Sequence, residues 1–170
     1  MKFFFLQVPI FVFCIHSGFS QTDKHINESN LPKSISEYIT AKYPDHSAVS
    51  YYKDTENDTV FYAADFTYKR QKYSLMFDLE GRWYETEIET SFEKLPEDAE
   101  DAIKNKLKSD FGKFKIIKTQ SVDIRGVLLY ELKIRGQKNN QSVFNEYFFD
   151  RQGNYIKFEV IELKPIPSLF

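Results

Sequence analysis

Phe77–Glu85 reads Phe-Asp-Leu-Glu-Gly-Arg-Trp-Tyr-Glu, and 72 residues later Phe149–Lys157 reads Phe-Asp-Arg-Gln-Gly-Asn-Tyr-Ile-Lys. Each copy has the composition of a strand end, a tight turn and the start of the next strand. In both copies an Asp side chain can bond the turn backbone, and a Gly three residues later tolerates a positive φ. An aromatic residue, Trp83 or Tyr155, follows each Gly at the same distance. The repetition predicts two equivalent hairpins with four structural turn residues: Asp78, Gly81, Asp150 and Gly153.

A helical pattern precedes each hairpin. Each pattern begins with Leu-Pro and places apolar residues at offsets 0, 4, 7, 8 and 12, which form one face of an α-helix. A proline is tolerated in the first turn, because its missing N–H would have no partner there. The two sets are Leu31, Ile35, Tyr38, Ile39 and Tyr43, and Leu95, Ala99, Ala102, Ile103 and Leu107.

Strand patterns fill the rest of the chain. We expect four strands between the helices, roughly 48–53, 59–68, 72–78 and 82–90, and four after the second helix, roughly 114–123, 127–135, 141–150 and 154–163. The predicted fold class is α+β, with tandem α-β-β-β-β repeats. Both helices would lie on one face of an antiparallel sheet, most simply a continuous eight-stranded one. The first repeat would span 31–90 and the second 91–164, followed by a C-terminal tail over 165–170.

The first twenty residues have the pattern of a secretory signal peptide. Lys2 is followed by the apolar run Phe3–Ile15, and Gly18-Phe19-Ser20 favours cleavage before Gln21. A lipoprotein signal is the alternative, but Phe13 stands before Cys14 where a small residue is wanted. A polar leader over 21–30 would follow the signal.

The composition of the expected mature chain limits the classes of function. It has no cysteine, and its 22 basic and 25 acidic residues, counted without Lys2, give a net charge of −3. An exported protein without disulfides depends on core packing for its stability. Without a basic patch or a second apolar span, neither nucleic-acid binding nor a membrane span after signal removal is expected.

Strand alternation predicts two different sheet faces. The helix-packed face would carry Val60, Tyr62, Ala64, Phe66, Leu75, Phe77, Tyr84, Thr86, Ile88, Leu128, Tyr130, Leu132, Ile134, Tyr147, Phe149, Ile156, Phe158 and Val160. The open face would carry an apolar strip bordered by Glu85, Glu87, Lys133 and Lys157. The strip consists of Phe61, Met76, Trp83, Leu129, Phe148 and Tyr155. Aromatic residues in a polar surround are typical of a binding patch, and cross-strand packing that only steadies the sheet is the alternative.

No pattern for catalysis, a metal or a cofactor is present. The mature chain would keep only His25 and His46, with no cysteine and no Gly-x-Ser-x-Gly turn, so we expect no enzyme and no zinc site. The acidic segment 54–58 offers oxygen ligands for a weak Ca²⁺ site, but it lacks the glycine and distal glutamate of an EF-hand loop. A solvated hairpin turn is the alternative there.

The repeated motifs resemble those of the PepSY-like family of secreted bacterial proteins. The residues that carry the resemblance are Leu31-Pro32, Phe77-Asp78, Gly81 and Trp83 in the first copy, and Leu95-Pro96, Phe149-Asp150, Gly153 and Tyr155 in the second. The tandem layout also resembles the β-lactamase inhibitory protein fold. The resemblance implies an exported, periplasmic, non-enzymatic domain with a role in inhibition or protein binding. That inhibitor is disulfide-bonded, whereas this mature chain would have no cysteine.

Two hypotheses of function follow. The first is a binding module of the cell envelope, an inhibitor or accessory partner of another exported protein, which uses the open sheet face. The second is a structural accessory domain that associates with its own copy. The partner would be a protein or peptide.

Overall fold

The computed structural model describes residues 25–56, 59–139 and 141–161, so the expected signal peptide and the C-terminal tail lie outside the described residues. The described part contains two α-helices, two 3₁₀ turns and eight strands. The helices are α1 (Lys33–Lys42) and α2 (Glu97–Asp110), and the 3₁₀ turns are η1 (Glu28–Asn30) and η2 (Phe92–Lys94). The strands are β1 (Ser50–Glu56), β2 (Thr59–Tyr68), β3 (Gln71–Phe77), β4 (Trp83–Thr90), β5 (Lys113–Ile124), β6 (Val127–Lys138), β7 (Gln141–Asp150) and β8 (Tyr155–Val160).

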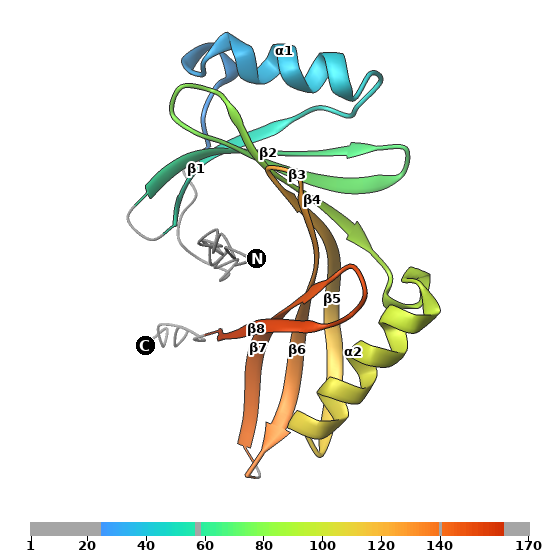
Figure 1. The fold of residues 1–170 in the computed structure, drawn as a ribbon. Coiled ribbons are helices and arrows are strands. Elements are labelled where there is room, and N and C mark those ends of the chain that lie inside the picture. The colour runs from blue at the N-terminus through green and yellow to red at the C-terminus, as the bar shows by residue number, and fades with distance from the viewer. Residues whose placement is uncertain (1–24, 57–58, 140, 162–170) are drawn as a thin grey trace, which may run out of the picture.

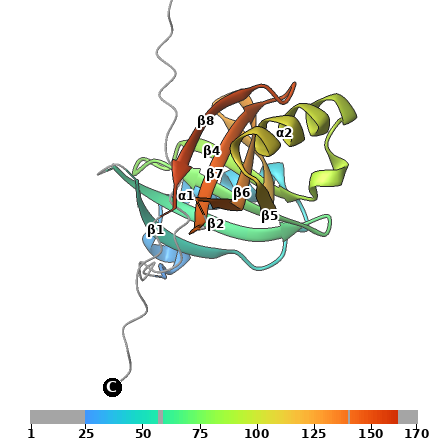
Figure 2. The same ribbon diagram turned by 90° about the horizontal axis from the view of Figure 1, so that it is seen from below.

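The eight strands form one antiparallel sheet in chain order, each strand pairing with the next. The sheet is strongly curved, and α1 and α2 both lie on its convex side, one over each half (Figure 1). Seen from below, the strands of the two halves run in different directions (Figure 2). The predicted α+β class and the continuous eight-stranded sheet are confirmed.

Each helix seals its own core on the convex side. The first core joins Ile35, Ile39 and Tyr43 to Tyr51, Ala64, Phe66, Leu75 and Phe77. The second joins Leu95, Ala99, Ile103 and Leu107 to Phe92, Phe111, Tyr130, Leu132, Ile134, Tyr147 and Phe149. The helix residues in both cores belong to the apolar helix faces that the sequence predicts. The prolines differ slightly from expectation, because Pro32 and Pro96 stand just before the first helical residue.

The two Asp–Gly turns are built alike. Oδ1 of Asp78 accepts the N–H of Glu80 (3.1 Å) and of Arg82 (2.9 Å), and Oδ1 of Asp150 accepts the N–H of Gln152 (2.9 Å) and of Asn154 (2.8 Å). Burial alone would raise the pKa of Asp78, but the hydrogen bonds from Arg82 outweigh it and hold the pKa below its ordinary value.

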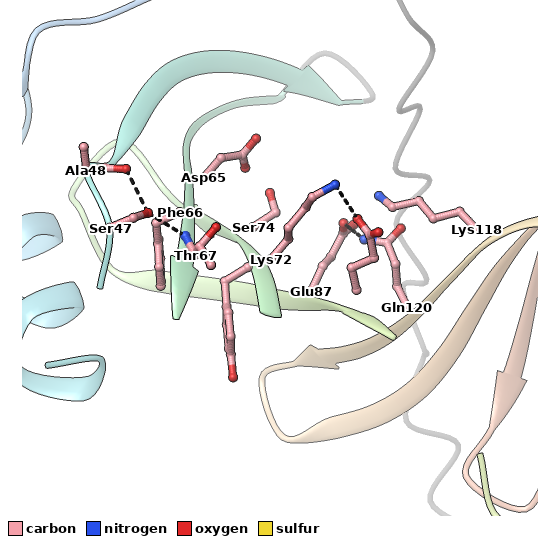
Figure 3. A pocket seen from close by; sticks show the side chains of 12 residues that line it. Ser47, Ala48, Asp65, Phe66, Thr67, Lys72, Ser74, Glu87, Lys118 and Gln120 are labelled. Atoms are coloured by element: carbon pink, nitrogen blue, oxygen red, sulfur yellow. Dashed lines mark hydrogen bonds and ion pairs between the residues drawn. The ribbon is translucent and has the colours of Figure 1, made fainter. Parts of the chain in front are cut away.

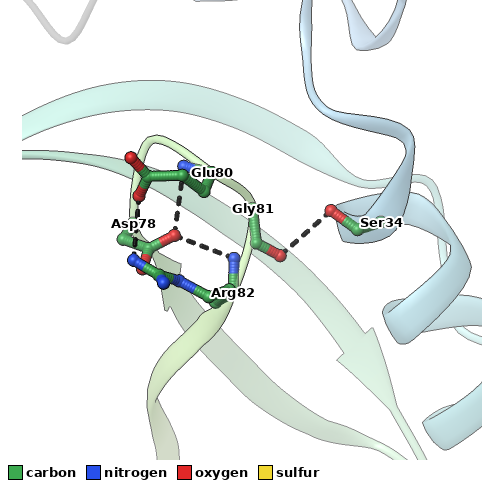
Figure 4. A network of polar contacts seen from close by, with 5 residues as sticks. All are labelled: Ser34, Asp78, Glu80, Gly81 and Arg82. Atoms are coloured by element: carbon green, nitrogen blue, oxygen red, sulfur yellow. Dashed lines mark hydrogen bonds and ion pairs between the residues drawn. The ribbon is translucent and has the colours of Figure 1, made fainter.

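Both turns also position a helix. Gly81 (φ +76°) and Gly153 (φ +81°) have the positive φ that the sequence predicts. The carbonyl of Gly81 accepts a hydrogen bond of 3.1 Å from the Ser34 hydroxyl of α1 (Figure 4). A Cβ on Gly153 would lie 2.5 Å from the Ala99 carbonyl oxygen of α2. The glycines therefore allow each helix to approach its hairpin closely.

A β-bulge follows each turn and changes which face the next residues occupy. The register shifts between Met76 and Phe77, and again between Phe148 and Phe149. Because a bulge adds one residue to a strand that otherwise alternates, it reverses the side chains on one side of it. The open-face prediction is therefore wrong for Trp83 and Tyr155, which lie opposite Phe77 and Phe149 on the helix side. The prediction for Tyr84 is wrong in the opposite direction. It was expected on the helix-packed face, but it packs with Phe61 and Met76 on the other face of the sheet.

Some residues predicted to be buried under the helices are exposed. Leu128, Ile156, Phe158 and Val160 are between 38% and 58% exposed. The strand residues of the core under α2 come from β6 and β7, with Phe114 and Ile116 of β5 packed against them, and no described residue of β8 belongs to this core.

The described end of the predicted leader is attached to the sheet. The N–H of Ile26 donates to the Tyr51 carbonyl at 2.9 Å, and His25 forms an isolated bridge with Tyr52. Ile26 also packs against the α1 core. The polar composition of the leader gave no sign of this contact.

Candidate binding face

The candidate site is the concave face, which we define as the sheet face opposite α1 and α2 (Figure 1). The strand register sets its transverse rows of side chains. One row contains Lys118, Lys133, Glu146 and Glu159, and the next contains Gln120, Glu131, Phe148 and Lys157. A third contains Asp65, Ser74, Glu87, Val122 and Leu129.

An apolar cluster occupies one part of this face. It contains Phe61, Met76 and Tyr84, with Ile124 packed against it. The rings of Phe61 and Tyr84 lie 5.0 Å apart between centroids. The bulge after the first turn makes this contact possible, since it directs Tyr84 to the concave side.

Three glutamates meet in the middle of the concave face. Glu131 and Glu146 are only 1% and 2% exposed, and the carboxylate of Glu146 lies 3.4 Å from the Lys133 ammonium. Burial raises the pKa of Glu131 well above its ordinary value, and the neighbouring charges of Glu87 and Glu146 add to this effect. Burial also raises the pKa of Glu87, although Lys118 and a hydrogen bond from Gln120 oppose it.

A pocket of about 340 Å³ lies where β2, β3, β4 and β5 run side by side. Charged groups of opposite sign surround it, and Lys72 and Glu89 pair at 3.4 Å on its rim. Lys118, Glu87 and Gln120 come together on one side of it (Figure 3). Its lining residues are Ser47, Ala48, Asp65, Phe66, Thr67, Lys72, Tyr73, Ser74, Glu87, Glu89, Lys118 and Gln120.

The concave face brings together four of the six residues predicted to bind a partner. Phe61, Met76, Leu129 and Phe148 lie on it, but they are only 1–5% exposed. They therefore form the interior of this face and not the exposed strip that the sequence predicted.

The other two predicted residues lie on the convex side. The Trp83 ring stacks on Tyr38 of α1, with centroids 6.4 Å apart and planes 11° apart, and its Nε1–H donates to the Thr86 hydroxyl at 2.9 Å. The Tyr155 ring packs against Tyr147 at 6.0 Å and Phe149 at 6.2 Å. Both rings are covered by a helix lysine, Lys42 at 5.1 Å and Lys106 at 4.4 Å.

Sequence reasoning missed the part of the pocket that β5 supplies. Lys118 and Gln120 are two residues apart on a strand, so strand alternation alone could have placed both on the same face of the sheet. Their proximity to Glu87 follows from the register between β4 and β5, which the sequence alone does not give.

Within 25–56, 59–139 and 141–161, no group of three His, Cys, Asp or Glu side chains is arranged to hold a metal ion. Asn57 and Asp58 of the acidic turn lie outside the described residues, so the Ca²⁺ alternative there stays a prediction. Among the helices that the structure describes, none is long and apolar enough to cross a membrane.

Solved structures share this fold. A DUF2874 family protein from Bacteroides ovatus is 17% identical, with a TM-score of 0.64 over 77% of this chain and 88% of that one. A "putative periplasmic protein" from Bacteroides eggerthii is 16% identical, with a TM-score of 0.64 over 77% and 89%. A BLIP-like protein from Bacteroides fragilis is 15% identical, with a TM-score of 0.63 over 82% and 92%. No family model and no curated protein matches the chain. The comparison therefore supports the predicted β-lactamase inhibitory protein-like fold, and the PepSY-like assignment stays a prediction.

Proposed function

We propose that this chain is a non-enzymatic binding module of the cell envelope, located in the periplasm, which binds another exported protein through its concave face. The observation that carries the proposal is the charged pocket on that face, lined from four adjacent strands. Binding sites are usually concave and carry a few polar groups that fix the orientation of what they bind. The charges there give orientation and selectivity to a partner more than affinity.

The pocket suits a charged or polar side chain of a partner protein. Lys118 offers a cation, while Glu87, Glu89 and Asp65 offer carboxylates around the same hollow. The buried residues Phe61, Met76, Leu129 and Phe148 support this surface from within the same face. A loop of a partner protein that inserts one side chain into the pocket would meet these groups.

The similar structures support the location and the class. The Bacteroides eggerthii protein is named as periplasmic, and the Bacteroides fragilis protein is named as BLIP-like. The predicted signal peptide agrees with export. Inhibition of a partner enzyme is one form that such binding would take.

We also infer that the two halves of the chain are copies of one unit. The same hydrogen bonds close both Asp–Gly turns, and a bulge follows each turn at positions 72 residues apart. A helix lysine covers the aromatic residue after each turn. These matching contacts support a repeat of the turn, the bulge and the helix contact as well as of the order of elements.

A charge reversal in the pocket tests the proposed function. Lys118→Glu places a like charge beside Glu87, while Lys108→Glu makes the same change on an exposed position of α2, on the convex side. Envelope proteins of the native host are captured with the parent and with both variants, and quantified by mass spectrometry. We expect a protein that the parent and Lys108→Glu capture and that Lys118→Glu loses, with all three chains folded at the capture temperature. Equal capture by both variants would contradict the proposal.

A further inference from the structure

The last strand, β8, forms one end of the sheet. Among the described strands it pairs with β7 alone. Its apolar residues Ile156, Phe158 and Val160 are 38%, 46% and 58% exposed. An exposed apolar edge strand is a ready template for pairing with another strand, and soluble proteins usually protect such an edge.

The hydrogen-bonding groups of this edge are directed outward at alternate residues. The N–H of Ile161 donates to the Phe144 carbonyl at 2.8 Å. Because bonded and non-bonded residue pairs alternate along an antiparallel ladder, Glu159 and Ile161 direct their backbone groups toward β7. Phe158 and Val160 therefore direct their N–H and C=O groups to the outer edge.

The sequence of β8 is self-complementary about Phe158. From residue 156 to 160 it reads Ile-Lys-Phe-Glu-Val, so apolar residues match apolar residues and a lysine matches a glutamate. In an antiparallel pair of two copies centred on Phe158, Lys157 of each copy lies opposite Glu159 of the other. Opposite charges at directly facing positions stabilise a sheet, and like charges destabilise it.

The charges select this register over its neighbours. A shift of two residues one way places Lys157 opposite Lys157, and the same shift the other way places Glu159 opposite Glu159. A shift of one residue reverses the faces of every side chain. The centred register also pairs the outward backbone groups of the two Phe158 residues with each other.

We propose that β8 is a homodimerisation edge, at which two copies of this chain pair antiparallel about a two-fold axis through Phe158 and join their sheets. Such an isologous contact is the commonest symmetry of homo-oligomers. The Phe158 ring already stacks on Tyr147, with centroids 5.4 Å apart and planes 21° apart, so the two central rings would extend an aromatic row across the dimer. Lys157 already pairs with Glu159 of its own strand. In the dimer each of these two residues would also face the opposite charge of the second copy.

A charge-swap series tests the register. The parent chain, Lys157→Glu, Glu159→Lys and the double variant Lys157→Glu/Glu159→Lys are compared by sedimentation equilibrium over a concentration series. Each single change places like charges opposite each other twice, so we expect the dimer dissociation constant to rise by roughly tenfold or more. The double variant restores both pairs and should restore the dimer. A parent that stays monomeric up to its solubility limit, or a double variant that dimerises as poorly as the single variants, overturns the proposal.

A cysteine at the symmetry centre provides a second test that does not depend on these charges. Directly paired residues of an antiparallel ladder lie at Cα distances compatible with a disulfide. In a Cys14→Ser background, Phe158→Cys should form a covalent dimer on mild oxidation. The matched control is Leu128→Cys, because Leu128 is also 46% exposed but lies on β6. Equal dimer yields from the two positions, or none from Phe158→Cys, overturn the proposal. Both experiments use the purified chain alone, so their outcome is independent of the concave-face partner.

Discussion

At the residue scale, the two turn glycines fix the distance between hairpin and helix. An alanine at Gly153 meets two obstacles: a positive φ of +81° and the backbone of Ala99, whose oxygen would lie 2.5 Å from the new Cβ. Since backbone atoms of a packed helix have little room to move, the cost exceeds that of the conformation alone.

We predict that Gly153→Ala lowers the free energy of unfolding by about 2–4 kcal/mol. Two controls separate the causes. Gly126 has φ +90° but open space around it, so Gly126→Ala should cost about 1–2 kcal/mol. Gly112→Ala meets neither obstacle and should change stability by less than about 0.5 kcal/mol. Urea titration checks all three, and equal values for Gly153 and Gly126 would show that the approach of α2 does not matter.

Glu131 is a carboxyl group whose burial opposes its charge. Its pKa is raised by burial and by Glu87 and Glu146, so the stability that its protonated form supports is present at low pH and is lost as the pH rises through the raised pKa. Glu131→Gln should therefore raise the free energy of unfolding at pH 7, because it removes a carboxyl group whose charged form is disfavoured in the folded chain. The gain should shrink as the pH falls below about 4.3, the ordinary pKa of Glu, because the unfolded chain then becomes protonated as well.

Thermal melts across this pH range test the prediction for Glu131. The matched control is Glu37→Gln, on an exposed position of α1, which should show no such pH-dependent gain. A Glu131→Gln variant that is less stable than the parent at pH 7 would mean that the charged carboxylate stabilises the fold.

Trp83 belongs to the α1 core and not to the binding face. It stacks on Tyr38 and lies beneath the Lys42 ammonium. Trp83→Ala should lower stability by about 2–3 kcal/mol and leave partner capture unchanged. Trp83→Phe, which keeps most of the ring contact, should lose less stability. Capture lost from a Trp83→Ala variant that is as stable as the parent would place a binding contact on the convex side.

At the scale of elements, the helices and most of the strands could be predicted because their patterns are long and regular. Two Leu-Pro segments with the same apolar offsets gave both helices, and the Asp–Gly turns gave the hairpins. The faces of Trp83, Tyr84 and Tyr155 could not be predicted in this way. Strand alternation predicts the face of each side chain only where the ladder is regular. Each bulge inserts one extra residue, and the sequence has no pattern that shows where it lies.

The phenylalanine that ends β3 and the one that ends β7 anchor the two cores. Phe77 and Phe149 are both fully buried, each under its own helix. Phe77→Ala and Phe149→Ala should each lower the free energy of unfolding by about 3–5 kcal/mol, because each leaves a cavity. Leu79→Ala, at a half-exposed turn position beside the first hairpin, should cost less than about 0.5 kcal/mol. If either Phe variant melts with the parent, the assignment of that strand to the helix face is wrong.

At the scale of the whole molecule, the two faces of the curved sheet differ in role: one packs against the helices, and the other is the proposed binding face. The convex side is occupied by α1 and α2, while the concave side holds the charged residues and the pocket. The pocket could not be derived from the sequence, because it depends on the relative placement of four strands. Some residues of the concave face could be predicted from strand alternation, since Phe61, Glu87 and Lys133 were assigned to that face correctly.

The measurement that tests the concave-face proposal most directly is photo-crosslinking in the native host. A photoreactive amino acid replaces Ser74, which lines the pocket, or Leu128, an exposed residue of β6 outside the pocket. The proposal predicts that Ser74 forms a covalent adduct with one specific envelope protein, that Leu128 does not, and that Lys118→Glu abolishes the Ser74 adduct. An adduct with the same protein from Leu128 but not from Ser74 would contradict the proposal and place the partner on another surface.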